Sequence, residues 1–329
     1  MSKPLISILV PVYGVERYIE RCARSLFEQT YDNLEFVFAN DCTTDRSMDI
    51  LHEIELQYPH LSDRIHIVHH ARNLGLAATR NTLMNHCSGT FVLHVDSDDW
   101  LEKDAVEQLM SEQQKNDADI VTGKYYVHFE NALVEETKIG KGLDRDSYLT
   151  AFFEQRVRWF VANRVIRTTL FTEHDIHWEE GINTNEDFMV MSYLLYFARR
   201  VSVVDVFTYH YDRTNESSYM SKLAHSWDYQ YQVVRSHQLI ANFYSDKPED
   251  IRKKVNALTI RQYQSMLWLT LENRNRSGYN TILSLLDSCS PDDLAVIGWD
   301  NKIKRWLEHH YTLARLTLPL RYMHGRLKD

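Results

Sequence analysis

Residues 91–100 read FVLHVDSDDW, an apolar run followed at once by three carboxylates within four positions. The run predicts a buried strand, and Asp96, Asp98 and Asp99 then lie at its carboxyl end. In open α/β sheets, ligands bind beyond the carboxyl ends of the strands, and hard divalent cations prefer carboxylate oxygens. The stretch therefore predicts a site for Mg²⁺ or Mn²⁺, with a solvated acidic turn that caps the next helix as the alternative.

Further apolar runs before and after this one predict the rest of a sheet. They recur at intervals of about thirty residues, which is the length that a β-α-β crossover needs. The runs are apolar on both faces, as expected of parallel strands covered by helices on each side. We predict an α/β fold with a doubly wound, mostly parallel sheet and helices on both faces. The predicted strands are Leu5–Val10, Glu35–Ala39, Ile65–Val68, Phe91–Val95 and Asp119–Thr122.

Apolar residues at helical spacing predict the elements that cover this sheet. Further along the chain we expect short strands near Tyr125 and Val201 and a helix over Asp187–Phe197, and after about Tyr219 the sequence turns polar, aromatic and helical. We predict a first domain over residues 1–219 and a helical C-terminal subdomain over residues 220–329. The two expected helical stripes on the sheet are Val15, Ile19, Cys22 and Leu26, and Met48, Leu51 and Ile54.

The bulk composition excludes several classes of protein. The 329 residues are 44% hydrophobic, which suffices for a large core. The formal net charge of −9 argues against nucleic acid as the main partner, because phosphate binding needs clustered Lys and Arg. The four cysteines form no CxxC pair, which favours a reducing cytoplasm. Apolar runs fall short of the roughly 20 residues that a spanning helix needs, so we expect any membrane contact to be peripheral.

Polar residues also follow the first two predicted strands. Pro11-Val12-Tyr13 follows the first, and Asn40-Asp41 follows the second, which places an aromatic ring and a carboxylate at one crevice. A base could stack there, and Asp41 could accept a hydrogen bond from a uracil imide, whereas the alternative makes residues 40–45 an N-cap. In the run NLGLAATRN at residues 73–81, a glycine opens a helix whose Arg80 could meet the acidic cluster or a phosphate, or be purely structural.

Taken together, these segments resemble the family-two inverting glycosyltransferases of the GT-A fold, of the type that builds bacterial glycans, capsules and lipopolysaccharide. That family typically shows the runs PVYN, DDGSTD, NxGxxxARN and DxDD. Here the runs stand in the same order as PVYG at residues 11–14, NDCTTD at 40–45, NLGLAATRN at 73–81 and DSDD at 96–99. Gly14, Asn40 and Cys42 depart from the pattern, which puts the preferred base and sugar in doubt.

The resemblance implies a hexosyltransferase that takes a hexose or N-acetylhexosamine from a UDP-sugar. The acceptor is expected to be a hydroxyl of a glycan or of a lipid-linked saccharide. The resemblance also implies that Asp96 contacts the nucleoside and that Asp98 holds the metal, Mn²⁺ or Mg²⁺, with Asp96 as a second ligand. The donor-binding residues that it implies are Pro11, Val12, Tyr13, Asp41, Arg80, Asp96, Ser97 and Arg213.

Glu186-Asp187, in the run GINTNEDFMVM, looks like the ED pair of this family. By that resemblance the pair is catalytic, and Asp187 is the base. An acceptor hydroxyl is a poor nucleophile at neutral pH, so a carboxylate that removes its proton is the expected device, and direct displacement then inverts the anomeric centre. The alternative is ordinary helix-start chemistry, with Asn185 as the cap and the acids facing the helix dipole.

The run YHYDR at residues 209–213, followed by Ser217 and Ser218, is similar to the YxYRxRxxS closing loop of the family. The resemblance makes Arg213 a phosphate ligand. His210 is either a third metal ligand or a hydrogen-bonded structural histidine. Trp100, Trp159 and Trp178 could stack on an acceptor sugar, although core packing is the commoner fate of Trp.

The segment 315–328 is locally basic and rich in leucine within an acidic protein. This composition suits peripheral contact with an anionic inner membrane face, whereas a docked helix with solvated basic residues is the alternative. A glycosyltransferase-like protein that binds nucleotides or glycans without turnover is the main rival function. A nucleotidyltransferase would need a lysine-rich loop near the first strand, and a dehydrogenase would need GxGxxG there; PVYGVE provides neither.

Overall fold

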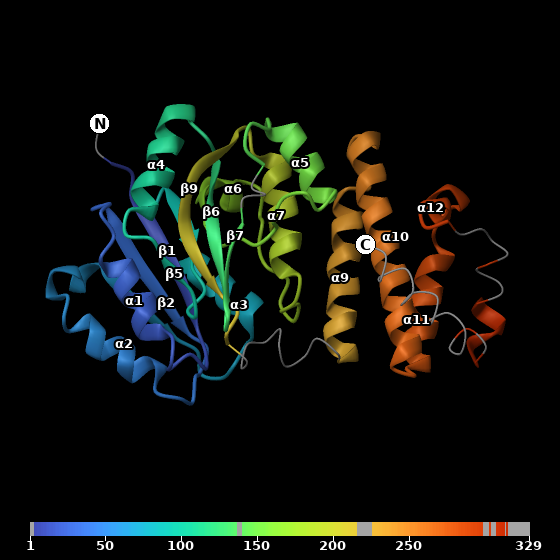
Figure 1. Ribbon diagram of the computed structural model, residues 1–329, viewed down its shortest axis with the longest axis horizontal. Coiled ribbons are helices and arrows are strands. Elements are labelled where there is room, and N and C mark those ends of the chain that lie inside the picture. Colours follow the sequence, from blue (N-terminus) through green and yellow to red (C-terminus); the bar gives the residue numbers. More distant parts are fainter. Residues whose placement is uncertain are drawn as a thin grey trace. The chain divides into compact units, whose positions relative to one another are not determined.

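The computed structural model describes residues 3–136, 140–215, 226–298, 303, 307–312 and 314. The chain divides into two compact units, Met1–Lys222 and Leu223–Asp329, which are described separately (Figure 1). The first unit carries the four motif runs and the ED pair.

The first unit is built on a nine-stranded sheet in the order β3-β2-β1-β4-β8-β6-β9-β5, with β7 paired to β6. The strands predicted from apolar runs are present, and Tyr125 belongs to one long β6. The strands are β1 (Ile6–Val12), β2 (Leu34–Asn40), β3 (Ile65–His69), β4 (Phe91–His94), β5 (Trp100–Leu101), β6 (Ile120–Phe129), β7 (Ala132–Glu136), β8 (Arg164–Arg167) and β9 (Val201–Asp212).

The sheet is parallel at one side and mixed at the other. Strands β3, β2, β1 and β4 run parallel, as does the pair β6 and β9. The short strands β5, β7 and β8 pair antiparallel with their neighbours. All seven residues of β1 are buried, because helices cover both of its faces.

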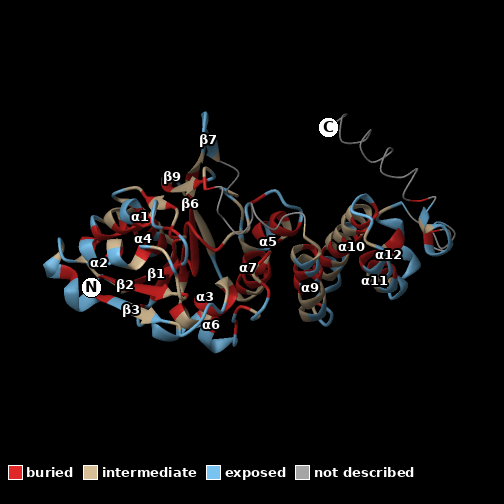
Figure 2. Cartoon of the chain, turned by 90° about the horizontal axis from the view of Figure 1, so that it is seen from below, coloured by how far each residue is buried: buried red, intermediate tan, exposed pale blue. Residues whose placement is uncertain are grey.

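Helices lie on both faces of this sheet (Figure 2). One face packs α1, α2 and α4 over the even-numbered residues of β1, such as Ile8 and Val10, in one continuous core. The other face carries α3, which contacts β1 and β2, and α6, which contacts β8. The helices of this unit are α1 (Ile19–Phe27), α2 (Ser47–Glu55), the 3₁₀ helix η1 (Pro59–Arg64), α3 (Leu76–His86), α4 (Ala105–Asn116), α5 (Arg145–Phe153), α6 (Thr169–Glu173) and α7 (Glu186–Phe197).

The strand register brings the predicted motifs to one edge. Val12 pairs with Asn40, and Leu9 pairs with His94, so the segments that follow β1, β2 and β4 leave the sheet side by side. The predicted glycine hinge is also present: Gly75, at φ 88°, directly precedes α3.

The second unit is helical in its described part. It contains α9 (Trp227–Phe243), α10 (Glu249–Glu272), α11 (Arg276–Asp287) and α12 (Pro291–Ala295). The long α10 packs against α9, α11 and α12, and the apolar faces of these helices form a hydrophobic core within the second unit. In the portion of the chain that the structure describes, a helix with the length and apolarity to cross a membrane is not found.

Candidate active site

The acidic cluster after β4 is tied to β9 through Asp99. Its Oδ2 accepts a hydrogen bond from the Tyr209 hydroxyl at 2.6 Å, and its Oδ1 accepts one from the Asp212 N–H at 2.8 Å. Burial, together with the charges of Asp98 and Asp96, raises the pKa of Asp99 well above its ordinary value. Asp99 therefore anchors the loop to β9.

Asp98 lies at the centre of this loop. Its Oδ2 accepts a hydrogen bond from Asn215 at 2.9 Å, and its carbonyl oxygen accepts one from the Arg21 guanidinium at 3.0 Å. Burial and the charge of Asp96 raise the pKa of Asp98 to about 6. The loop thus concentrates negative charge that its own side chains do not fully neutralise.

Arg21 of α1 clamps the loop from the other side. Its guanidinium lies 3.6 Å from the centroid of the Trp100 ring and also donates to Asp212 at 2.6 Å. The contacts of Arg21, Asn215 and Tyr209 with this loop could not be predicted from local sequence, because each residue reaches the loop from a distant part of the chain. Ser97, which stands between Asp96 and Asp98 in the sequence, is buried.

Arg80 of α3 links the acidic cluster to the ED pair. Its Nη2 donates to Asp96 Oδ1 at 3.0 Å, and its Nε lies 3.5 Å from Asp187 Oδ1. Burial lowers the pKa of Arg80, but the charges of Asp187 and Asp96 outweigh it and raise the pKa above its ordinary value. Of the contacts predicted for Arg80, the one with the acidic cluster is present. At 1% exposure, Arg80 serves here as an internal bridge between carboxylates.

Glu186 and Asp187 are the first two residues of α7, and both are buried. Asn185 makes no side-chain capping hydrogen bond, whereas Glu186 and Asp187 do lie in the first turn of α7, where the helix dipole favours acidic residues. Asp187 Oδ2 accepts a hydrogen bond from the Val161 N–H at 3.0 Å.

The two carboxyl groups differ in their surroundings. Burial and the charge of Asp187 raise the pKa of Glu186 to about 8. Burial also raises the pKa of Asp187, but Arg80 and the Val161 N–H oppose that rise. The surroundings of Glu186 therefore favour its protonated form, whereas Arg80 and the Val161 N–H favour the carboxylate form of Asp187. Where the surroundings of two neighbouring carboxyl groups shift their pKa values apart, one group can act as an acid and the other as a base.

The residues predicted to hold the nucleotide line the ends of β1 and β2. Pro11 and Val12 are buried in β1, whereas the Tyr13 ring is 54% exposed and available for stacking. The Asp41 carboxylate accepts hydrogen bonds from His70 at 2.8 Å and from the N–H groups of Leu74 at 2.7 Å and Gly75 at 2.9 Å. Asp41 thus organises the loop before α3.

Cys42 departs from the family pattern in residue type but not in backbone. Its φ is 57°, in the left-handed region that favours glycine, which is the residue usual for the family at this place. The thiol is partly exposed. The loop therefore holds a non-glycine residue in a conformation that favours glycine, which strains the backbone.

His210 has protein partners on both ring nitrogens. Its Nδ1 lies 2.9 Å from His128 Nε2, its Nε2 lies 2.9 Å from Glu102 Oε1, and its ring stacks on Trp100. Of the two roles predicted for His210, this geometry is that of the hydrogen-bonded structural histidine. Arg213 is exposed, and its guanidinium lies 5.6 Å from the centroid of the Phe129 ring.

The remaining predictions concern the tryptophans expected to stack on an acceptor sugar and the segments after residue 215. Trp178 is fully buried against His94 and Phe171, so its prediction as an acceptor platform was wrong and core packing explains it. Trp100 is covered by Arg21 and His210. Ser217, Ser218 and the basic segment 315–328 lie outside the described residues.

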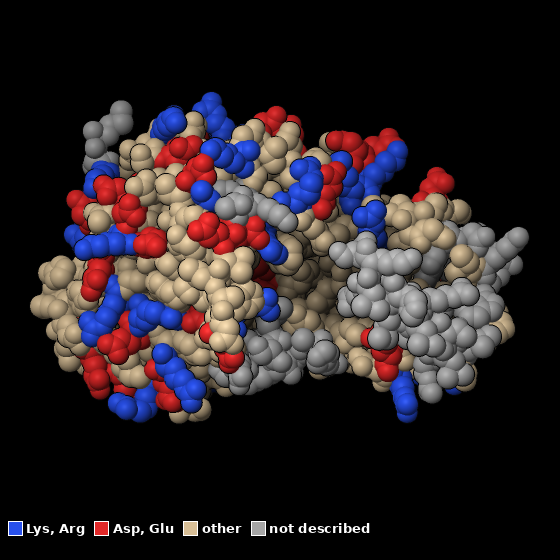
Figure 3. Space-filling view, viewed as in Figure 1, with Lys and Arg blue, Asp and Glu red and all other residues tan. Residues whose placement is uncertain are grey.

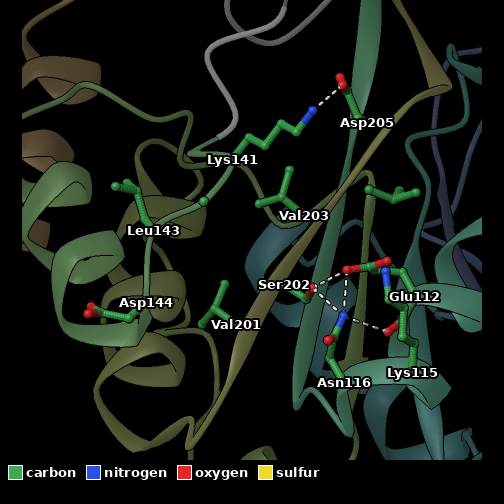
Figure 4. Close-up of a pocket in the computed structure, with 12 residues that line it drawn as sticks. Glu112, Lys115, Asn116, Lys141, Leu143, Asp144, Val201, Ser202, Val203 and Asp205 are labelled. Carbon is green, nitrogen blue, oxygen red and sulfur yellow. Dashed lines mark hydrogen bonds and ion pairs between the residues drawn. The ribbon is translucent and has the colours of Figure 1, made fainter.

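A cavity of about 520 Å³ lies at the start of β9, at the opposite end of this strand from Tyr209 (Figure 4). Its polar groups bind one another: Asn116 and Ser202 share the Glu112 carboxylate, and Lys141 binds Asp205. On the face of the first unit that Figure 3 shows, acidic and basic side chains are interspersed. The convergence of carboxylates, an arginine and strand ends is therefore found at Asp96–Asp99 and not at this cavity.

The sequence matches the family model "Glycosyl transferase family 2" over residues 7–177, which is more than half of the chain. The chain belongs to that family. It is 34% identical to the putative glycosyltransferase EpsH of Bacillus subtilis (strain 168) over 224 residues, 64% of this chain and 61% of that protein. It is 26% identical to the poly(ribitol-phosphate) beta-N-acetylglucosaminyltransferase TarS of Staphylococcus aureus (strain MW2) over 70% of this chain and 39% of TarS. The matches thus span less than two thirds of these relatives.

Solved structures confirm the predicted GT-A fold. The S. aureus TarS 1–349 complex with UDP-GlcNAc matches with a TM-score of 0.74 at 20% identity, over 98% of this chain and 92% of that one. The Pyrobaculum calidifontis mannosyltransferase PcManGT, solved with GDP-Man and Mn²⁺, matches with a TM-score of 0.57 at 14% identity, over 97% and 88% of the two chains. The family model and the sequence relatives confirm the expected glycosyltransferase family.

Proposed function

We propose that the protein is an inverting glycosyltransferase that moves a hexosyl or N-acetylhexosaminyl group from a UDP-sugar to a hydroxyl of a glycan or lipid-linked saccharide. The observation that carries the proposal is the bridge from Asp96 through Arg80 to Asp187. It joins a carboxylate loop suited to the donor diphosphate with a buried carboxylate suited to the acceptor proton. One site thus has groups for both reacting partners of a direct displacement, the sugar donor and the acceptor hydroxyl.

Asp187 acts as the general base in this proposal. The Arg80 guanidinium and the Val161 N–H favour its carboxylate form, so it can take the acceptor proton as the new bond forms. Glu186 stays protonated beside it, since its pKa is raised to about 8, and so adds no second negative charge to the pocket. Attack opposite the leaving diphosphate inverts the anomeric centre.

Asp98 and Asp96 are the proposed ligands of a divalent cation. Their carboxylate oxygens are the hard donors that such a cation prefers. The raised pKa of Asp98 reflects its burial and a negative charge in the loop that a bound cation would balance. Within the described ranges, His, Cys, Asp and Glu side chains do not form a three-residue metal cage. Mg²⁺-type sites often use only one or two carboxylates and take their other ligands from water and phosphate. When bound, Mn²⁺ or Mg²⁺ would stabilise the charge that develops on the leaving diphosphate.

The remaining donor contacts are proposed from the strand ends. The exposed ring of Tyr13 can stack on the base above Pro11 and Val12. Asp41 and Ser97 shape the nucleoside pocket, and Arg213 is the proposed diphosphate ligand. Because His210 already uses both ring nitrogens, it supports the loop through Trp100 in this proposal.

UDP is the proposed nucleotide because TarS, which is similar to this chain in sequence and in fold, was solved with UDP-GlcNAc. The proposed location is the cytoplasmic side of the membrane, with the basic segment 315–328 as the peripheral contact. A glycosyltransferase-like binding protein without turnover is the second candidate, and the altered NDCTTD run favours it.

The test is thermal unfolding of the protein with UDP, GDP, dTDP and CDP, each with and without Mn²⁺. A ligand at 100 times its Kd stabilises the native state by about 2.7 kcal/mol, which shifts Tm measurably. We expect a shift with UDP that requires Mn²⁺, followed by release of UDP from a UDP-sugar. Binding without turnover of any sugar donor would favour the second candidate in its nucleotide-binding form. An absence of binding to any nucleotide would refute the transferase and favour the second candidate in its glycan-binding form.

A further inference from the structure

The segment 178–185 carries α7, and with it Asp187, to the active site. Its first residue is fixed to α3 by a reciprocal pair of hydrogen bonds. Asn81 Nδ2 donates to the Trp178 carbonyl at 2.8 Å, and the Trp178 N–H donates to Asn81 Oδ1 at 2.9 Å. An asparagine amide presents a donor and an acceptor side by side, so it pairs with a backbone much as another peptide group does.

The other end of the segment is fixed to the same helix by Asn183. The Ala77 N–H, in the first turn of α3, donates to Asn183 Oδ1 at 2.9 Å. Asn183 also lies directly on Gly75, since a Cβ built at Gly75 would come within 2.6 Å of Asn183 Nδ2. The glycine of the NLG run is therefore needed for the approach of this side chain as well as for its φ of 88°.

The two fastening points flank Arg80 on α3. Ala77 lies three residues before Arg80, and Asn81 follows it. The segment is further anchored by the buried Trp178 indole, whose ring centroid lies 5.1 Å from that of His94 on β4. The distance of 3.5 Å between Arg80 Nε and Asp187 Oδ1 is thus set by contacts on either side of Arg80.

We propose that Asn81 and Asn183 are positioning residues for Asp187, an inference that rests on the proposed function. The contacts of Asn81 and Asn183 between the segment 178–185 and α3 hold Asp187 against Arg80. They also fix its distance from the acidic loop at residues 96–99. A general base must lie within hydrogen-bond reach of the proton that it removes. A displacement of about 1 Å can cost about 100-fold in rate.

The experiment compares Asn81→Ala and Asn183→Ala with a matched control, Asn116→Ala. Asn116 also bridges two elements through its amide, donating to Glu112 at 2.6 Å and to Ser202 at 3.1 Å, but at the far end of β9 (Figure 4). Asn183→Asp is the conservative variant, because it keeps an oxygen for the Ala77 N–H at the positive end of α3.

The first measurement is UDP release with Mn²⁺ from UDP-glucose, UDP-galactose, UDP-GlcNAc and UDP-GalNAc, with water in place of the acceptor hydroxyl, so that the products are UDP and the free sugar. The second is calorimetric titration with UDP and Mn²⁺. The titration gives the fraction of folded, donor-competent protein, by which kcat is normalised. We expect normalised kcat to fall about 10- to 100-fold in Asn81→Ala and Asn183→Ala, with donor KM and UDP affinity changed less than about 2-fold. Asn183→Asp should recover most of the rate, and Asn116→Ala should leave it unchanged.

Normalised rates near the wild-type value in both alanine variants would overturn the inference and leave the proposed function standing. Equal losses in Asn183→Asp and Asn183→Ala would overturn it as well, and so would an equal loss in Asn116→Ala. A wild-type protein that binds UDP but releases it from none of the donors would refute the proposed function, and this inference would fall with it.

Discussion

Arg80→Met is the substitution that most severely perturbs the bridge between the two halves of the site. Met keeps much of the apolar stem of Arg80 but removes its charge. Asp96 and Asp187 then lose their shared cation, and Asp187 is buried. Removing one partner of a buried ion pair leaves an uncompensated charge, which is strongly destabilising.

The size of the effect follows from the distances. At 3.0 and 3.5 Å, each pair is worth roughly 5 kcal/mol of attraction at an effective dielectric constant of 20. Desolvation of Arg80 offsets part of this attraction, and broken buried pairs typically cost about 3–5 kcal/mol. We expect Arg80→Met to lower the free energy of unfolding by about that amount at pH 7.

The sign of the pH dependence is fixed by Asp187. Burial raises its pKa, Arg80 opposes the rise, and loss of Arg80 therefore raises the pKa further. A carboxyl whose folded pKa is raised contributes stability at low pH that is lost as the pH increases through that folded pKa. The cost of Arg80→Met should thus be larger at pH 8 than at pH 5.

Urea denaturation of four proteins at pH 5 and pH 8 measures this: wild type, Arg80→Met, Asp187→Asn and the double variant. In the Asp187→Asn background, Arg80→Met should cost about 1–3 kcal/mol less than in the wild type, because one of the stranded charges is gone. An unfolding free energy unaffected by Arg80→Met, or a cost identical at both pH values and in both backgrounds, would refute this role for the bridge.

Three further predictions follow from single residues. Asp98→Ala should abolish the Mn²⁺ dependence of UDP binding, as measured by calorimetry, while a retained dependence would place the metal elsewhere. Glu186→Gln should become progressively more stable than wild type between pH 5 and pH 9, because the pKa of Glu186 is about 8 in the folded state and about 4.5 in the unfolded state. The gain in the free energy of unfolding is at most about 1.4 kcal/mol per pH unit. Thermal unfolding measures it, and an equal Tm difference between the two proteins at pH 5 and pH 9 would contradict it. Trp178→Ala should cost about 3–5 kcal/mol in urea denaturation, and a cost below about 1 kcal/mol would contradict its place in the core.

The parallel part of the fold could be predicted from sequence because its signals are local. Each apolar run of β1 to β4 is followed by its own motif, and the side-by-side exit of parallel strands then brings the motifs together. Gly75 opens α3 because the chain needs its φ of 88° at that place, which the sequence indicates directly. The contact of Arg80 with the acidic cluster was predicted on the same grounds.

The mixed part of the sheet could not be predicted in the same way. Strand β8 is only four residues long and reads RVIR, and most of β7 is exposed, so neither shows a hydrophobic period. Their pairing with β6 is decided by tertiary contacts that a local pattern does not contain. The partners of Asp99 and Arg21 could not be predicted for the same reason, since Tyr209 and Asp212 lie 110 and 191 residues away.

Asp187 is the proposed base of a metal-assisted transfer. The most direct test compares the rate of UDP release in Asp187→Asn and wild type, with Mn²⁺ and a UDP-sugar that the wild-type protein turns over. Calorimetry measures UDP binding by both proteins. Asparagine keeps the shape of the side chain and an oxygen for the Val161 N–H but removes the basic carboxylate. We expect kcat to fall by about 100-fold or more, in line with the contribution of a positioned general base, with UDP affinity retained. Turnover at the wild-type rate in Asp187→Asn would contradict it.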